Sequence, residues 1–213
     1  MAGPGDFDIQ WTSERSLRVS GPMPAHAAAG VLRGVSGIRD VVPTEGAVYL
    51  TVDPLGDVTP DKLAQKLKGV EGRPAPEPRV HEIAVCYEPP HAMDLAEVAR
   101  LSEMAEHEVV EAHTSTEFTV AFLGFAPGFG YLTGLPERLH VPRLASPRTR
   151  LEAGSVGVAG PYSGVYGLPG PGGWRIIGRT KAVMFGVERE EPALLRAGDV
   201  VRFRSITARE FDA

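Results

Sequence analysis

Arginine and hydroxyl side chains gather in the one part of this sequence that could bind a charged small molecule. Between residues 124 and 180 lie six arginines against two glutamates, a local charge of +4 on a chain whose total is −5. Guanidinium groups bind carboxylates and phosphates, and serine hydroxyls add hydrogen-bond donors. The candidate anion ligands are Arg143, Arg148, Ser155, Ser163 and Arg179. The alternative is that these arginines lie on a solvated face or pair with acids elsewhere, and that the serines belong to ordinary turns.

Aromatic residues accompany this basic segment. Phe125, Phe129 and Tyr131 alternate, so in an extended strand they would share one face. The candidate cleft-lining residues are Phe125, Pro127, Phe129, Tyr131, Tyr162 and Trp174. The alternative is that the aromatic rings cap a hydrophobic core. Residues 124–173 hold 12 Gly and 7 Pro. Such a composition with so many aromatics predicts ordered loops, where binding and catalysis concentrate, rather than a solvated linker.

His113 is the one candidate for a general acid or base, because the pKa of histidine lies near neutrality. It could equally be a charge at the end of a helix, where it would interact with the helix dipole. The sequence contains no phosphate-binding GxxxxGK[ST] loop, no GxSxG and no HExxH. Its six histidines lack metal-ligand spacing, so we expect no metal site. The catalytic residues are therefore not assigned by motif.

Composition limits the class of protein. The 213 residues are 43% hydrophobic, enough for a substantial core, and Cys86 excludes an intrachain disulfide because it is the only cysteine. The first residues lack a secretory signal, and no apolar run is long enough for a membrane span, so we expect a cytoplasmic protein. The net acidic charge argues against nucleic acid as a partner. A small anion is the better match for a compact basic segment.

The expected domain order begins with a loose N-terminus, residues 1–14, and a small α/β domain, residues 15–70. Strands are predicted around Leu17–Val19, at Ile38–Val42 and at Ala47–Val52. Helices are predicted at Ala25–Arg33 and from Pro60, with Thr59 as its N-cap. The order β-α-β-β-α is typical of part of a split βαβ, or ferredoxin-like, unit.

A proline-rich linker at residues 71–79 is predicted to separate this domain from a β-barrel-like domain at residues 80–213. Asp94 and Glu97 suggest a capping box at the start of a helix. The helical pattern continues up to His113 as two short helices or one bent one. Strands are expected at Glu82–Tyr87, Phe118–Leu123, Trp174–Ile177, Ala182–Val187 and Val200–Phe203. The whole chain is therefore expected to be an α+β protein.

A series of short motifs resembles a known family. The motifs are FLGFAPGFGYL (122–132), PR (142–143), SPR (146–148), AGSV (153–156), AG (159–160), PGGW (171–174), IGRT (177–180) and LRAGDVVRF (195–203). In this order they resemble the family of the 5-oxoprolinase B subunit, also called allophanate hydrolase subunit 1 or carboxyltransferase subdomain C/D, which includes a sporulation-kinase inhibitor.

The resemblance implies a cyclophilin-like β-barrel after the N-terminal domain. It also implies a non-autonomous subunit whose partners are the C subunit (carboxyltransferase subdomain A/B), in a tight hetero-oligomer, and the A subunit. Such a complex uses ATP with Mg²⁺ to open 5-oxoproline to glutamate. One alternative is a component of a biotin-dependent urea carboxylase, with biotin as cofactor. Another is a histidine-kinase inhibitor without catalytic activity.

The sequence departs from the family pattern at a few positions. After Tyr87 the family's Gly-Gly-Glu is replaced by a segment that begins with Glu88 and Pro89. Tyr162 stands where a Gln is common, and Gly167 and Gly170 replace a Pro and a Ser. Hydrogen bonds to substrate and the shape of a loop near it depend on these positions. The resemblance therefore indicates the family more strongly than it indicates one substrate.

Overall fold

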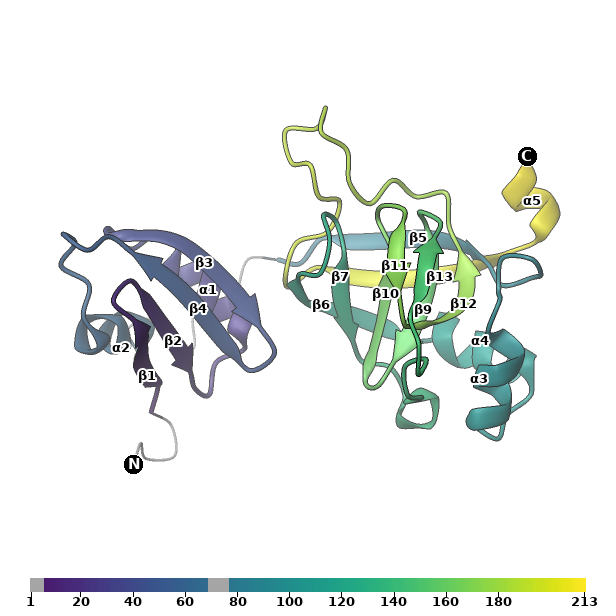
Figure 1. Cartoon of the computed structure of the whole chain (residues 1–213), viewed down its shortest axis with the longest axis horizontal. Helices are drawn as coiled ribbons and strands as arrows, with labels where there is room; N and C mark the ends of the chain where they lie inside the picture. Colours follow the sequence, from purple (N-terminus) through teal and green to yellow (C-terminus); the bar gives the residue numbers. More distant parts are fainter. Residues whose placement is uncertain (1–5, 69–76) are drawn as a thin grey trace. The chain divides into compact units, whose positions relative to one another are not determined.

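The computed structural model describes residues 6–68 and 77–213 of the chain. These fall into two compact units that divide between Glu77 and Pro78, and each is described by itself (Figure 1). Most of the predicted linker, residues 71–76, lies outside the described residues. None of the helices within 6–68 and 77–213 has the length and apolar character needed to cross a membrane.

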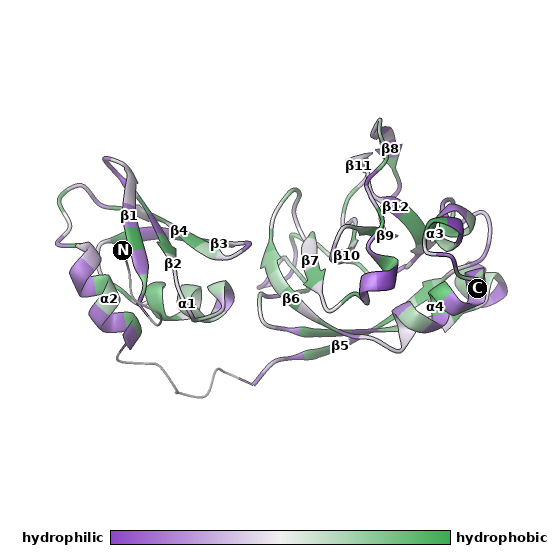
Figure 2. Cartoon of the chain, turned by 90° about the horizontal axis from the view of Figure 1, so that it is seen from below, coloured by the Kyte–Doolittle hydropathy of each residue, from purple (hydrophilic) through white to green (hydrophobic). Residues whose placement is uncertain are grey.

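The first unit is a four-stranded antiparallel sheet with two helices. Its elements are β1 (Asp8–Ser13), β2 (Ser16–Ser20), α1 (Ala25–Leu32), β3 (Ile38–Thr44), β4 (Ala47–Val52) and α2 (Pro60–Lys68). The strand order is β1-β2-β4-β3. Alternate strand residues such as Leu17 and Leu50 are buried in one core with Leu32 of α1 and Leu63 of α2. The hydropathy colouring shows that α2 is mostly hydrophilic (Figure 2).

One prediction for this unit was wrong. Residues 8–13, expected to belong to a loose N-terminus, form β1, which pairs with β2 from Asp8↔Ser20 to Ser13↔Ser16. The strand was missed because only Ile9 and Trp11 interrupt its polar residues, and most of its side chains are exposed. Backbone pairing to β2 and the packing of the half-buried Ile9 on the core hold this edge strand in place.

The second unit is a closed barrel with strand order β10-β7-β6-β13-β5-β12-β9. Its strands are β5 (Val80–Cys86), β6 (Glu117–Leu123), β7 (Gly130–Thr133), β9 (Ser155–Ala159), β10 (Tyr162–Val165), β12 (Arg175–Arg179) and β13 (Val200–Ile206). A two-stranded ribbon is formed by β8 (Arg148–Leu151) and β11 (Gly170–Gly172). The helices are α3 (Leu95–Leu101), α4 (Glu106–Thr114), the 3₁₀ turn Glu137–Leu139 and α5 (Ala208–Asp212). The α+β fold with a barrel after a small domain is thus confirmed (Figure 1).

The barrel is closed by a parallel pair. β5 and β13 pair in register over their full length, from Val80↔Val200 to Cys86↔Ile206. Parallel neighbours need a long crossover, and here the crossover contains every other strand of the barrel. α3 packs on β12 and α4 on β13, so the helices cover part of its outside (Figure 1).

The glycine- and proline-rich segment is not built of loops alone. It contributes five strands, β7 to β11, and three of them belong to the barrel. By contrast, the strand expected at Ala182–Val187 is absent from the part of the chain that is described, where only an isolated bridge joins Phe185 to Ala193. The apolar side chain of Met184 is buried here without a ladder of backbone hydrogen bonds.

Gly154 provides a test of how tightly the barrel is closed. It has a φ of 82°, and a Cβ atom there would overlap the carbonyl oxygen of Thr180. Gly154→Ala should therefore lower the free energy of unfolding by at least about 2 kcal/mol, combining backbone strain with overpacking. Gly160→Ala is the matched control, because Gly160 also has a positive φ, 51°, but has no heavy atom within 4 Å of the added Cβ. It should cost about 1 kcal/mol in urea unfolding. Equal losses for both variants would contradict the close approach to Thr180.

Candidate functional site

A pocket of about 470 Å³ opens on the barrel beside the ribbon of β8 and β11. We call it the aromatic pocket. Its lining residues come from the turn between β6 and β7, the segment before β8, and the segment around β11: Phe125, Phe129, Tyr131, Arg143, Leu144, Ala145, Pro147, Tyr166, Pro171, Gly172, Gly173 and Trp174. Its volume is in the range of small-molecule binding sites.

Phe129 forms the centre of the aromatic cluster. Its ring centroid lies 5.4 Å from Phe125, 5.1 Å from Tyr131 and 5.2 Å from Trp174, each in an edge-to-face arrangement. Phe129 is buried, whereas Phe125 is 62% exposed. Of the two roles considered for these aromatic rings, lining a cleft and capping the core, each therefore holds for a different residue. Phe129 belongs to the core, and Phe125 presents its ring to solvent where a ligand can reach it.

The segment from Phe125 to Phe129 is a turn, and β7 begins only at Gly130, so the extended geometry that would place the three rings on one face does not form. Phe125 has a φ of 65° and Gly128 a φ of 75°, both in the left-handed region. The turn is closed by hydrogen bonds from the Gly124 N–H to the Phe129 carbonyl, 3.1 Å, and from the Phe129 N–H to the Ala126 carbonyl, 3.0 Å. A left-handed phenylalanine is uncommon and is found where surrounding structure holds it, often at a functional site.

Of the three arginines expected to bind an anion, Arg143 alone lines the pocket with its guanidinium uncommitted. Arg148 forms a bidentate pair with Asp94 at 2.6 and 3.0 Å, and Arg179 donates to the Ala153 carbonyl at 3.2 Å. No hydrogen bond or ion pair within the described residues holds Arg143, which lies exposed at the pocket.

Asp94 was expected to cap α3, but it makes no such cap. Its carboxylate accepts from Arg148 and from the N–H of Ile176, 2.7 Å away. It thereby joins the start of α3 to β8 and β12. Arg175, which no sequence pattern singled out, donates to the Pro142 carbonyl at 3.0 Å and pairs with Glu97 at 3.2 Å. Arg175 thus fixes the backbone directly before Arg143.

The two tyrosines of the pocket remain phenols at neutral pH. Burial raises the pKa of Tyr166, although a backbone hydrogen bond from Trp174 and the charge of Arg143 oppose the shift. Burial likewise raises the pKa of Tyr131, again against the charge of Arg143. The polar side chains of the pocket are therefore one cation and neutral hydroxyls. This set suits a ligand that carries a negative group on a compact apolar or cyclic body.

The two candidate serines do not reach the pocket. Ser155 is 3% exposed, and its hydroxyl donates to the Glu152 carbonyl at 2.7 Å. Ser163 is fully buried, within 2.8 Å of His113 Nε2 and 3.3 Å of the Gly157 carbonyl. Both hydroxyls are used inside the barrel. Pro127 and Tyr162 also lie outside the lining, although the Tyr162 ring is 5.5 Å from that of Tyr131.

His113 is a core residue of the barrel. It is completely buried at the end of α4, with Nδ1 2.8 Å from the Tyr87 hydroxyl and its ring stacked on Phe203. Burial lowers its pKa to about 3, so the ring is neutral. A substrate in the aromatic pocket would not touch it. His113, the candidate general acid or base, therefore has a structural role as a buried hydrogen-bonding residue.

The buried imidazole makes barrel stability depend on pH. The unfolded chain takes up a proton near pH 6.5, whereas the folded histidine stays neutral down to about pH 3. Stability should therefore fall as the pH drops through this window, by roughly 1 kcal/mol for each pH unit from this residue. In His113→Gln the slope of unfolding free energy against pH should be smaller by that amount, measured by urea unfolding. His107→Gln, exposed on the same helix, is the control, and an unchanged slope in His113→Gln would contradict a neutral buried ring.

Comparison with known proteins assigns this chain to a family. Residues 2–195 match the family model of the carboxyltransferase domain, subdomain C and D. The chain belongs to this family. It is similar to the 5-oxoprolinase B subunit of Escherichia coli O157:H7, with 54% identity over 128 residues, 60% of this chain and 59% of the relative. The match thus spans less than two thirds of that relative.

Solved structures of longer chains contain the same fold. The protein TTHA0988 is 36% identical to this chain, with a TM-score of 0.77. The match covers 91% of this chain and 40% of the TTHA0988 chain. The urea amidolyase of K. lactis covers all of this chain with a TM-score of 0.72 at 17% identity, and that likeness shows the fold alone. The fold of this chain therefore also occurs as part of longer chains.

The sequence pattern predicted part of the pocket and missed the rest. Seven lining residues lie between the predicted positions: Leu144, Ala145, Pro147, Tyr166, Pro171, Gly172 and Gly173. Tyr166 could have been found, because it is a further aromatic residue of the glycine- and proline-rich segment 124–173. Within residues 6–68 and 77–213, no group of three or more His, Cys, Asp or Glu side chains could hold a metal ion.

Proposed function

We propose that this chain is the B subunit of an ATP-dependent 5-oxoprolinase and that its aromatic pocket binds the 5-oxoproline carboxylate. The observation that carries the proposal is the uncommitted guanidinium of Arg143 beside a cluster of aromatic rings. The similarity to a relative named as the B subunit of 5-oxoprolinase supplies the substrate.

5-Oxoproline is a flat five-membered lactam with one carboxylate. Arg143 would bind that carboxylate through its paired N–H groups, because a guanidinium matches carboxylate geometry. Phe125 and Trp174 would contact the ring, and the neutral Tyr131 hydroxyl would donate to the lactam carbonyl. Each contact uses a group that the pocket lining already holds.

The pocket does not supply the chemistry of ring opening by itself. Its lining contains no carboxylate, histidine or cysteine among the described residues, so it offers neither a general base nor a strong nucleophile. We therefore propose that the C subunit completes the site by forming a tight hetero-oligomer with this chain. The C and A subunits together would contribute the site for ATP and Mg²⁺. This chain would bind and orient the substrate.

The complete complex provides the first test. The purified A, B and C subunits, mixed with 5-oxoproline, ATP and Mg²⁺, should release glutamate, whereas this chain alone should release none. Enzymatic detection of glutamate, with a reference enzyme run in parallel, measures the outcome. The fold is shared with urea amidolyase, so the same preparation should be tested with urea and a biotin carrier carboxylated beforehand, whose carboxybiotin supplies the carboxyl group. Carboxyl transfer to urea without glutamate release would replace the proposal by the biotin-dependent alternative, and binding to a histidine kinase without either activity would favour the inhibitor.

Arg143 provides the second test. Arg143→Met keeps much of the length of the side chain but removes the charge, so 5-oxoproline should bind at least about tenfold more weakly, because a charge-assisted pair is worth about 1.5–3 kcal/mol. Calorimetry or competition in the assembled complex would measure the affinity.

Arg150→Met is the matched control for Arg143. It removes an arginine of the same basic segment, 67% exposed and paired with Glu152, that does not line the pocket. The complex that carries Arg150→Met should bind 5-oxoproline with unchanged affinity. Equal losses in the two variants would show a general effect of charge and would contradict a carboxylate site at Arg143.

A further inference from the structure

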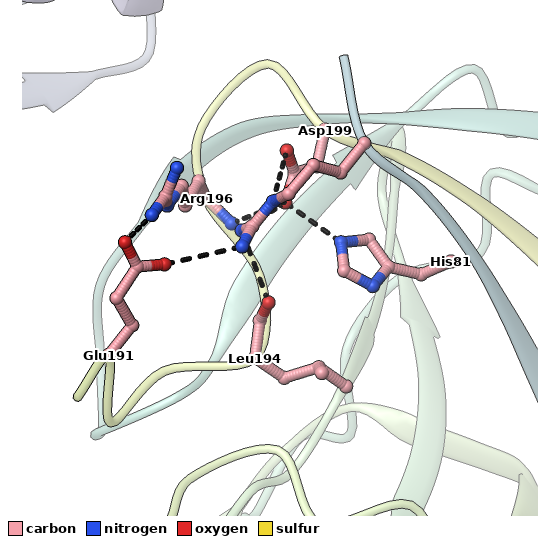
Figure 3. Close-up of polar contacts among 6 residues, drawn as sticks. His81, Glu191, Leu194, Arg196 and Asp199 are labelled. Carbon is pink, nitrogen blue, oxygen red and sulfur yellow. Dashed lines mark hydrogen bonds and ion pairs between the residues drawn. The ribbon is translucent and has the colours of Figure 1, made fainter. Parts of the chain in front are cut away.

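A polar cluster surrounds Asp199 where β5 and β13 begin. Its carboxylate, 6% exposed, accepts from Arg79 at 2.6 Å, from His81 Nε2 at 2.9 Å and from the Arg196 N–H at 2.9 Å. Figure 3 shows His81 and Arg196 beside Asp199, with dashed lines for the contacts. Burial acts to raise the pKa of Asp199, but the hydrogen bonds outweigh it and hold the pKa below its usual value. The acid is therefore charged and fully engaged at neutral pH.

Arg79 connects this cluster to the segment 184–195. Besides its three hydrogen bonds to the Asp199 carboxylate, the Arg79 guanidinium donates to the Leu194 carbonyl at 3.3 Å and to Glu191 Oε2 at 3.2 Å. Glu191 in turn pairs with Arg196. One side chain thus holds both the turn before β13 and the middle of a long segment that has almost no strand pairing of its own.

The held segment continues to the base of the aromatic pocket. The Leu194 N–H donates to the Met184 carbonyl at 2.8 Å. That carbonyl oxygen lies against Gly128, where a Cβ would approach it to 2.7 Å, and the Leu195 side chain would lie 3.2 Å from a Cβ at Gly130. Gly128 and Gly130 flank Phe129, the central ring of the pocket. The path from Arg79 to Phe129 therefore consists of direct hydrogen bonds and close packing.

We propose that Arg79, through its bond to Leu194, is a positioning residue for the aromatic pocket. It holds residues 184–195 as the support on which the turn 124–130 rests, and so fixes the rings of Phe125 and Phe129. The proposal rests on the pocket being the binding site given under Proposed function, but its primary test needs no ligand. A salt bridge that only stabilised the barrel would leave the turn 124–130 as it is.

The test compares Arg79→Lys and Arg79→Met in the full chain. A lysine keeps a charge beside Asp199, but its single ammonium cannot also reach Glu191 and the Leu194 carbonyl with the geometry of a guanidinium. The control is Arg202→Met, which breaks the exposed pair of Arg202 with Glu117 on the same barrel without touching residues 184–195. Hydrogen exchange followed by mass spectrometry reports on peptides that contain the amides of Gly124 and Phe129.

In Arg79→Lys these amides should exchange at least about tenfold faster than in the wild type, while amides of β9 and β12 keep their protection. In Arg79→Met the amides of 124–130 should exchange at least as fast, and the barrel as a whole should be less stable because Asp199 loses its charged partner. In a Trp11→Phe background, Trp174 fluorescence should become more accessible to acrylamide. The urea midpoint of Arg79→Lys should stay near that of the wild type, and in the assembled complex its affinity for 5-oxoproline should fall several-fold. Arg202→Met should leave the exchange at 124–130 unchanged.

Two results would overturn the proposal. One is wild-type exchange at 124–130 in Arg79→Lys, since the bond to Leu194 would then not matter. The other is faster exchange at 124–130 in Arg79→Lys that is matched in β9 and β12, which would indicate general loosening of the barrel. If the exchange result holds but 5-oxoproline binds no variant or wild-type complex, the proposed substrate is wrong and the positioning role of Arg79 stands.

Discussion

The parallel pairing of β5 with β13 is the constraint on which the second unit depends. The two strands lie about 120 residues apart in sequence, and each pair from Val80↔Val200 to Cys86↔Ile206 must form before the barrel can close. Long-range parallel pairing is costly in chain entropy and is formed late or slowly. The pair therefore needs a strong local anchor at its start. Asp199, bonded to Arg79 and His81 at the start of β5, is that anchor, because the Val200 N–H bonds to the Arg79 carbonyl beside it.

Most of the polar side chains around the aromatic pocket hold the fold, and one does not. Asp94, Arg148 and Arg175 join α3 to the strands beside the pocket, and Ser163 and His113 bond to each other inside the barrel. Each is buried or half-buried, so leaving its partner unpaired would be costly. Arg143 differs in being exposed at an aromatic pocket with no bonded partner among the described residues. The neighbouring charges thus serve rigidity, and this guanidinium stays available for a ligand.

Regular patterns were enough to predict much of the fold, but contacts distant in sequence decided the site. The alternation of Leu17 and Val19 and the apolar run of β6 correctly indicated strands. The strands β7 to β11 were missed because glycine and proline hide hydrophobic periodicity. Arginine and aromatic residues were expected to form a binding site and do line the candidate pocket, yet which arginine stays free depends on Asp94, which pairs with Arg148 across 54 positions. No local pattern carries that information, and the same holds for the burial of His113.

The glycine content that first suggested loops has a different cause in the folded barrel. A Cβ at Gly164 would come within 2.9 Å of the Phe129 ring, and one at Gly157 within 3.1 Å of the Trp174 side chain. Strands β9 and β10 therefore carry small residues where large rings pack directly against the backbone. The glycines leave the space that the aromatic rings fill. A segment rich in both is better interpreted as the wall of a ring-lined pocket than as a flexible connection, and the two strands that carry the glycines are what hold those rings in place.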